Sequence, residues 1–153
     1  MGNSRFVYVT YIRTTPAKLW KALLDPEFTR RYWCEIVHES EWKPGASWRM
    51  MIPDGRVTDS GEVLEIEPER KLVLKWGNQF KPELRAEGYS RMTCELEQQG
   101  DTVKLTILHE IDKPDSKLIE AVSGGWPMIL ASLKSLLETG EPLEQTRHWP
   151  KGH

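Results

Sequence analysis

The chain has 153 residues, with 21 basic and 23 acidic side chains and a formal net charge of −2. A chain of this length forms one domain with its own core and needs no disulfide or metal to hold it together. The near-neutral charge gives no electrostatic reason to expect binding to nucleic acid or to an anionic membrane. No segment reaches the roughly 20 apolar residues that span a bilayer, and the first residues lack the apolar stretch of a signal peptide. With Cys34 and Cys94 expected to stay reduced, these features indicate a soluble, cytoplasmic protein.

The first part of the chain predicts a strand followed by two short helices. Residues 6–13 are rich in β-branched and aromatic side chains, which favours a strand. Thr15-Pro16 and Asp25-Pro26 each combine an N-cap residue with proline at the first helical position. A short helix is therefore expected after each of these dipeptides.

Six more strands are predicted, separated by turns rich in proline, glycine and aspartate. They are expected at residues 37–42, 47–52, 61–66, 72–76, 89–97 and 102–109. Apolar and polar side chains alternate along them, which indicates an antiparallel sheet with one covered face and one solvated face. By this alternation Trp48, Met50, Trp76 and His109 belong to the covered face.

The last long apolar segment predicts a helix that packs across the sheet. Its apolar residues recur at steps of three and four and form one stripe: Trp126, Ile129, Leu130, Leu133, Leu136 and Leu137. Gly125 and Pro127 are expected to open this helix and Gly140 to close it. Residues 116–123 are expected to form only a short helical turn before it. We therefore expect one α+β domain over residues 1–140 and a polar, loosely held tail over residues 141–153.

A series of motifs in this order resembles the activator of heat-shock protein 90 ATPase homologue family. The series includes Pro16-Ala-Lys-Leu-Trp-Lys-Ala-Leu-Leu-Asp-Pro26, Gly45-Ala-Ser-Trp-Arg-Met50, Leu72-Val-Leu-Lys-Trp76, Leu105-Thr-Ile-Leu-His109 and Gly125-Trp126 through Gly140. The resemblance covers roughly residues 5 to 140. It implies the helix-grip fold of the START-like (SRPBCC) superfamily, in which a curved antiparallel sheet wraps around a long C-terminal helix. Many members of that superfamily hold an apolar ligand between the sheet and the helix.

The sequence contains no recognisable catalytic or metal-binding set. There is no Gly-x-Ser-x-Gly elbow, phosphate loop or dinucleotide fingerprint. His38, His148 and His153 do not have the spacing to cysteines or carboxylates that a zinc site requires. His109 points inward, where it is either an acid–base or ligand-binding group or a structural residue with its hydrogen bonds satisfied. We therefore expect no catalytic residue, no metal and no cofactor.

Aromatic and apolar residues on the covered face are the candidate ligand-binding residues. They are Trp33, Trp48, Met50, Trp76, Tyr89, His109, Trp126, Ile129 and Leu133. The alternative is that the same side chains fill an ordinary core. The long connection over residues 77–88 is predicted to act as a lid over a cavity.

Three functions agree with these observations. The first is a non-catalytic binding module for a small apolar or amphipathic molecule in a cavity between the sheet and the last helix. The second is a co-chaperone that contacts heat-shock protein 90, as the family resemblance implies. The third is a cyclase-like or hydrolase-like enzyme that uses the same cavity, because START-like relatives include such enzymes.

Overall fold

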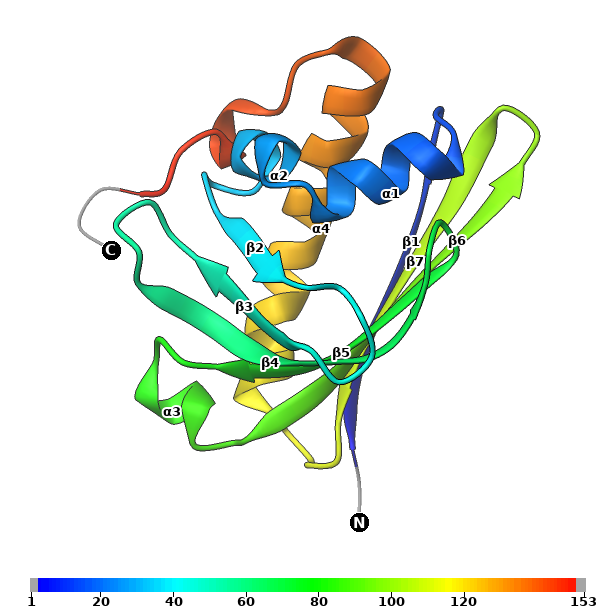
Figure 1. The fold of residues 1–153 in the computed structure, drawn as a ribbon. Helices are drawn as coiled ribbons and strands as arrows, with labels where there is room; N and C mark the ends of the chain where they lie inside the picture. Colours follow the sequence, from blue (N-terminus) through cyan, green and yellow to red (C-terminus); the bar gives the residue numbers. More distant parts are fainter. Residues whose placement is uncertain (1–2, 151–153) are drawn as a thin grey trace.

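The computed structural model describes residues 3–150 of the chain (Figure 1). His153 and the end of the predicted tail lie outside the described residues. The strands are β1 (Ser4–Ile12), β2 (Val37–Ser40), β3 (Ser47–Met51), β4 (Val57–Glu67), β5 (Lys71–Asn78), β6 (Tyr89–Gln99) and β7 (Thr102–Ile111). The helices are α1 (Pro16–Leu24), α2 (Pro26–Tyr32), α3 (Pro82–Arg85), α4 (Lys117–Thr139) and the 3-10 turn η1 (Glu144–Thr146).

The seven strands form one antiparallel sheet in the order β1-β7-β6-β5-β4-β3-β2. Strands β2 to β7 follow each other as a meander, and β1 pairs with β7 at the far edge, with Phe6 opposite His109. Figure 1 shows the sheet curving around α4, with α1 and α2 at one end of that helix. The predicted α+β helix-grip fold is thereby confirmed.

The two short helices begin where the sequence predicts. The Thr15 hydroxyl accepts a hydrogen bond from the backbone N–H of Lys18 at 3.3 Å, and the Asp25 carboxylate accepts one from the N–H of Glu27 at 2.9 Å. Each helix then starts with a proline, whose missing N–H costs nothing in the first turn.

Helix α4 begins nine residues before Trp126, at Lys117, and the expected short turn over residues 116–123 is part of it. The Ser116 hydroxyl caps the helix by accepting from the N–H of Ile119, and the Glu87 carboxylate accepts from the N–H groups of Lys117 and Leu118. Burial works against the charged form of Glu87, but these bonds and one from Ser116 outweigh it and lower the pKa of its carboxyl.

The earlier start of α4 corrects the prediction that Gly125 and Pro127 open this helix. Glycine and proline are unfavourable inside a helix, so their presence on either side of Trp126 is a local pattern typical of a helix N-terminus. The cap from Glu87 comes from the connection between β5 and β6, which no local pattern reveals.

The tail is held against the domain as far as Trp149, which corrects the expectation of a loosely held segment. Thr146 is 2% exposed, and its carbonyl accepts a hydrogen bond from the N–H of Cys34 at 2.7 Å. Its hydroxyl donates to Ser132 on α4 at 2.6 Å. The Trp149 ring meets the Phe80 ring edge-on, with 5.9 Å between centroids. These contacts dock a segment that is polar in overall composition.

Within residues 3–150, no helix combines the length and the apolar character that crossing a membrane requires. Cys34 and Cys94 are both free thiols, and Cys94 is buried. Burial raises the pKa of the Cys94 thiol to about 12, so it stays protonated and unreactive at neutral pH.

Candidate functional site

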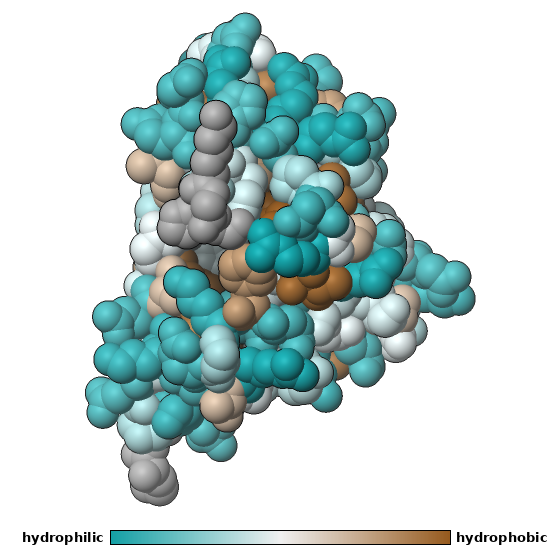
Figure 2. Space-filling model, turned by 90° about the vertical axis from the view of Figure 1, so that its left-hand side faces the viewer, coloured by the Kyte–Doolittle hydropathy of each residue, from teal (hydrophilic) through white to brown (hydrophobic). Residues whose placement is uncertain are grey.

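A cavity of about 330 Å³ lies between the sheet, α3 and the N-terminal half of α4. Most of its lining is apolar: Trp33, Ile36, Met50, Trp76, Phe80, Leu84, Leu118, Ala121, Val122, Gly125, Trp126, Ile129 and Trp149. Thr58, Asp59, Asn78 and Lys81 are the polar residues that border it. Figure 2 looks at the side of the molecule that carries α3 and shows apolar surface near its centre, surrounded by hydrophilic residues.

Five of the nine candidate ligand-binding residues line this cavity: Trp33, Met50, Trp76, Trp126 and Ile129. The side chains of Trp48, His109 and Leu133 are fully buried and do not line it. Tyr89 is 50% exposed, and the Lys75 ammonium lies 4.6 Å from its ring centroid. In β6 the neighbouring residue, Ser90, points inward, so the alternation of side chains places Tyr89 on the outer face. The expectation that Tyr89 contributes to the cavity is therefore corrected.

His109 is linked by hydrogen bonds to two of the four tryptophans that line the cavity, directly to Trp126 and through Ser90 to Trp76. The indole N–H of Trp126 donates to Nδ1 of His109 at 3.1 Å, which requires the neutral tautomer with its proton on Nε2. Nε2 lies 2.8 Å from the hydroxyl oxygen of Ser90, and that hydroxyl donates to the carbonyl of Trp76 at 2.8 Å. Burial lowers the pKa of His109 to about 3. Of the two interpretations of His109, the structure supports the structural residue with satisfied hydrogen bonds.

A second buried tryptophan–histidine pair joins β2 and β3. The indole N–H of Trp48 donates to Nδ1 of His38 at 3.0 Å, and burial lowers the pKa of His38 to about 3. The sequence suggests only a metal-ligand role for His38 to be weighed, and no local pattern in it indicates this pair. Among residues 3–150, no three histidine, cysteine, aspartate or glutamate side chains come together as a metal site would require.

Gly61 allows the tryptophans to pack against each other. It stands opposite both Trp48 and Trp76 in the register of the sheet, and those two rings meet with 4.6 Å between centroids. A Cβ atom on Gly61 would lie 1.7 Å from the carbonyl oxygen of Lys75, so no other residue fits without moving β5. The contact continues to Trp126, whose ring centroid lies 5.7 Å from that of Trp76 and 5.3 Å from that of Trp33.

A buried carboxyl group lies at the polar end of the cavity. Asp59 is 8% exposed, and its Oδ2 accepts the indole N–H of Trp76 at 2.8 Å. Burial raises the pKa of Asp59 above its ordinary value, against the opposing effect of its hydrogen bonds. The neighbouring Thr58 is 5% exposed, and its side-chain hydrogen bond to Asp59 is one of the bonds that lower the pKa of that carboxyl.

The strand predicted from residue 61 onward does not include this polar end. Strand β4 begins at Val57, and Thr58-Asp59-Ser60 lacks the apolar alternation that marks the other strands. The interruption of an otherwise regular pattern by consecutive polar residues is the one local signal that points to the site.

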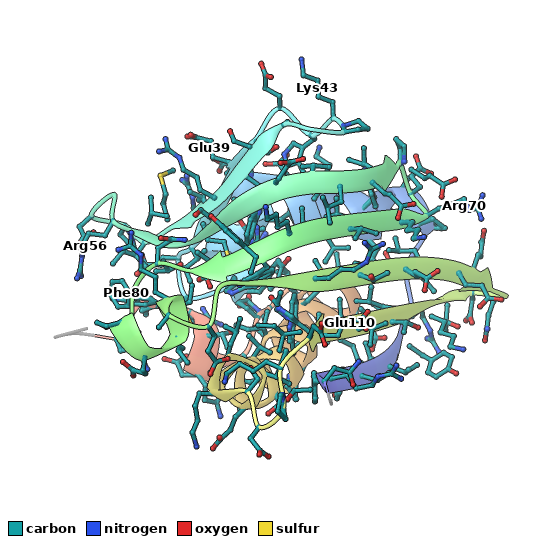
Figure 3. All side chains as sticks on the ribbon, turned by 90° about the horizontal axis from the view of Figure 1, so that it is seen from below. Glu39, Lys43, Arg56, Arg70, Phe80 and Glu110 are labelled. Atoms are coloured by element: carbon teal, nitrogen blue, oxygen red, sulfur yellow. The ribbon has the colours of Figure 1, made fainter. Side chains whose placement is uncertain are left out.

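The connection predicted as a lid forms one wall of the cavity. It carries α3, and its residues Phe80, Lys81 and Leu84 line the opening. The guanidinium group of Arg56 lies over the Phe80 ring, 5.1 Å from its centroid, and Figure 3 shows these two residues together at one end of the sheet. Trp149, from the tail, also borders the cavity and contacts Phe80. The mouth of the cavity is therefore built from segments that are far apart in the sequence.

Solved structures with the same fold come from several bacteria. Protein MLL2253 from Mesorhizobium loti is 23% identical, with a TM-score of 0.75 over 88% of this chain and 97% of that one. CalU16 from Micromonospora echinospora is 22% identical, with a TM-score of 0.72 over 93% of this chain and 78% of that one. The Aha1 dimer from Colwellia psychrerythraea is 15% identical, with a TM-score of 0.69 over 90% of this chain and 98% of that one. Among curated proteins, none matches the sequence significantly.

The amino-acid sequence identifies the family of the protein, whereas the likeness to these structures shows only the fold. Residues 13–138 match the family described as Activator of Hsp90 ATPase homolog 1-like protein. This segment runs from the end of β1 almost to the end of α4 and includes every residue that lines the cavity except Trp149. The chain therefore belongs to the Activator of Hsp90 ATPase homolog 1-like family, with the helix-grip architecture of the SRPBCC proteins.

Proposed function

We propose that the protein is a non-catalytic binding module for a small apolar or amphipathic molecule, held in the cavity between the sheet and α4. The observation that carries the proposal is the cavity itself, about 330 Å³ in volume and walled by Trp33, Trp76 and Trp126. Binding sites for small molecules have volumes of roughly 300–1,000 Å³, with mostly apolar walls and a few polar groups.

The walls of the cavity are held in position before any ligand arrives. The indole N–H of Trp76 is bonded to Asp59, and that of Trp126 is bonded to His109. These bonds fix the orientation of both rings, so that little conformational entropy remains to be lost on binding. His109 has both ring nitrogens engaged, and this favours a structural role over acid–base catalysis.

The proposal predicts that a neutral apolar fluorescent probe binds the folded protein. We expect N-phenyl-1-naphthylamine to bind with a Kd of roughly 1 μM, which corresponds to about −8 kcal/mol. The rise in probe emission on titration measures the affinity. Energy transfer from the tryptophans of the wall to the probe provides a second readout.

Two neighbouring glycines of α4 provide a matched pair of variants. Gly125 lines the cavity and Gly124 does not, and a Cβ atom at either position meets nothing within 4 Å. We expect Gly125→Leu to weaken probe binding by roughly tenfold or more, because its side chain fills part of the cavity. Gly124→Leu should leave the affinity unchanged. Equal binding by both variants, or no binding by the wild type, would refute the proposed site.

A second candidate function is contact with heat-shock protein 90, favoured by the family to which the chain belongs. The edge strand β1 exposes three apolar side chains on its outer face, Val7, Val9 and Tyr11, and such a row suits contact with another protein. This candidate predicts that the chain stimulates the ATPase of heat-shock protein 90. Replacing Val7 and Val9 by threonine should reduce the stimulation, whereas Gly125→Leu should not. If micromolar concentrations of this protein leave the ATPase rate of heat-shock protein 90 unchanged, this candidate function is excluded.

A further inference from the structure

We infer that the molecule bound in the cavity carries a protonated amine, which Asp59 and Thr58 bind while the apolar part of the molecule lies among the tryptophans. This inference rests on the proposed binding function and specifies the chemical class of the ligand.

Asp59 carries the one carboxyl group among the lining residues that the structure describes. A carboxylate has about four acceptor positions, and the side chains of Trp76, Thr58 and Asn78 donate to that of Asp59, which leaves room for a further donor. The other side-chain acceptor nearby, Oδ1 of Asn78, is already bonded to the backbone N–H groups of Phe80 and Lys81 at 2.9 and 2.8 Å. Asp59 therefore keeps capacity to accept from a ligand, whereas Asn78 serves to shape the loop before α3.

The hydroxyl of Thr58 is a second polar group beside the Asp59 carboxylate. Thr58 is 5% exposed and borders the cavity, and its hydroxyl donates to Asp59, so its oxygen keeps lone pairs that can accept from a ligand. A primary ammonium group has three N–H donors and can satisfy the carboxylate and the hydroxyl together.

The charge environment of Asp59 favours a bound cation over a bound anion. Burial disfavours the charged form of Asp59, and a bound cation offsets that cost, whereas a bound anion increases it. Lys81 also borders the cavity but is exposed, so solvent screens its charge more strongly than that of Asp59.

A set of three ligands with the same chain length tests the inference: octylamine, 1-octanol and octanoate, at neutral pH. Binding is measured by isothermal titration calorimetry and by the change in tryptophan emission. We expect the amine to bind roughly tenfold or more tightly than the alcohol, because a charge-assisted hydrogen bond replaces a neutral one. The carboxylate should bind most weakly.

Asp59→Asn removes the charge but keeps an oxygen that can accept from Trp76. This variant should lose most of the preference for the amine, with a fall in amine affinity of roughly tenfold, while the affinity for 1-octanol stays the same. Thr58→Val should weaken amine binding by a smaller factor. Asp101→Asn is the matched control, because Asp101 is exposed in the turn between β6 and β7 and should leave all three affinities unchanged. Cooperative thermal unfolding confirms that each variant is folded.

The outcomes separate this inference from the proposed function. Comparable binding of all three ligands, or tighter binding of octanoate, would overturn the amine assignment and leave the binding function standing. Absence of binding by these ligands and by N-phenyl-1-naphthylamine would overturn both. If Asp59→Asn does not fold, the order of the three ligands on the wild type and on Thr58→Val decides the question.

Discussion

Replacing Trp126 by alanine is expected to lower the free energy of unfolding by about 3–5 kcal/mol. Trp126 is 5% exposed, and its ring packs against those of Trp33 and Trp76. Its removal enlarges the existing cavity and leaves Nδ1 of His109 without the donor that it has in the wild type. Urea unfolding, followed by circular dichroism, measures the change.

Trp126→Phe separates the two contributions. Phenylalanine keeps most of the packing but cannot donate to His109, so we expect a loss of about 1–3 kcal/mol from the unpaired acceptor. An alanine variant that loses less than about 1 kcal/mol would show that Trp126 is not part of a packed wall. Probe binding measured on the same two variants reports whether the enlarged space still accepts an apolar molecule.

The free energy of unfolding is also expected to fall steeply as the pH drops below about 6.5, the ordinary pKa of histidine. His38 and His109 both have a pKa of about 3 in the folded protein. Between the two pKa values the unfolded chain binds protons that the folded protein does not, so protonation favours unfolding. The stability that the neutral histidines contribute is therefore complete above the unfolded pKa and is lost as the pH falls toward 3.

The expected size of this effect follows from the two histidines. Each contributes a slope of about 1.4 kcal/mol per pH unit, which gives roughly 5 kcal/mol for both between pH 6.5 and 4.5. Asp59 acts in the opposite direction, because its pKa is raised in the folded protein and the folded state then holds its proton more tightly. Urea unfolding at a series of pH values between 7 and 4.5 measures the net slope.

Glutamine replaces each histidine as a non-titrating control. Its amide oxygen can accept from the tryptophan indole, as Nδ1 of the neutral imidazole does, and at position 109 its NH2 group can also donate to Ser90. We expect His109→Gln and His38→Gln each to remove about half of the histidine contribution to the slope. A wild-type stability that does not change between pH 7 and 5 would contradict the assignment of both histidines as buried and neutral.

Local patterns in the sequence determined most of the architecture. The alternation of apolar and polar residues placed Trp48, Met50 and Trp76 on the inner face, where the structure has them. The cap-and-proline pairs located both short helices, and the stripe that includes Leu130 and Leu133 identified the face of the last helix that is buried. These features depend on side chains a few residues apart, so a single segment contains all the information that they need.

The tertiary structure alone decided where α4 begins, how the tail docks and which polar residues line the cavity. Glu87 caps α4 from a distant loop, and Thr146 reaches Ser132 across the domain. The polar end of the cavity depends on Asp59. An aspartate in water has no special property, and this one is distinctive because the fold buries it beside Trp76. Whether aromatic residues on the inner face fill the core or leave a cavity depends on the curvature of the sheet and on hydrogen bonds between strands and helix. Both arise from contacts between residues far apart in the chain, and no local pattern specifies them.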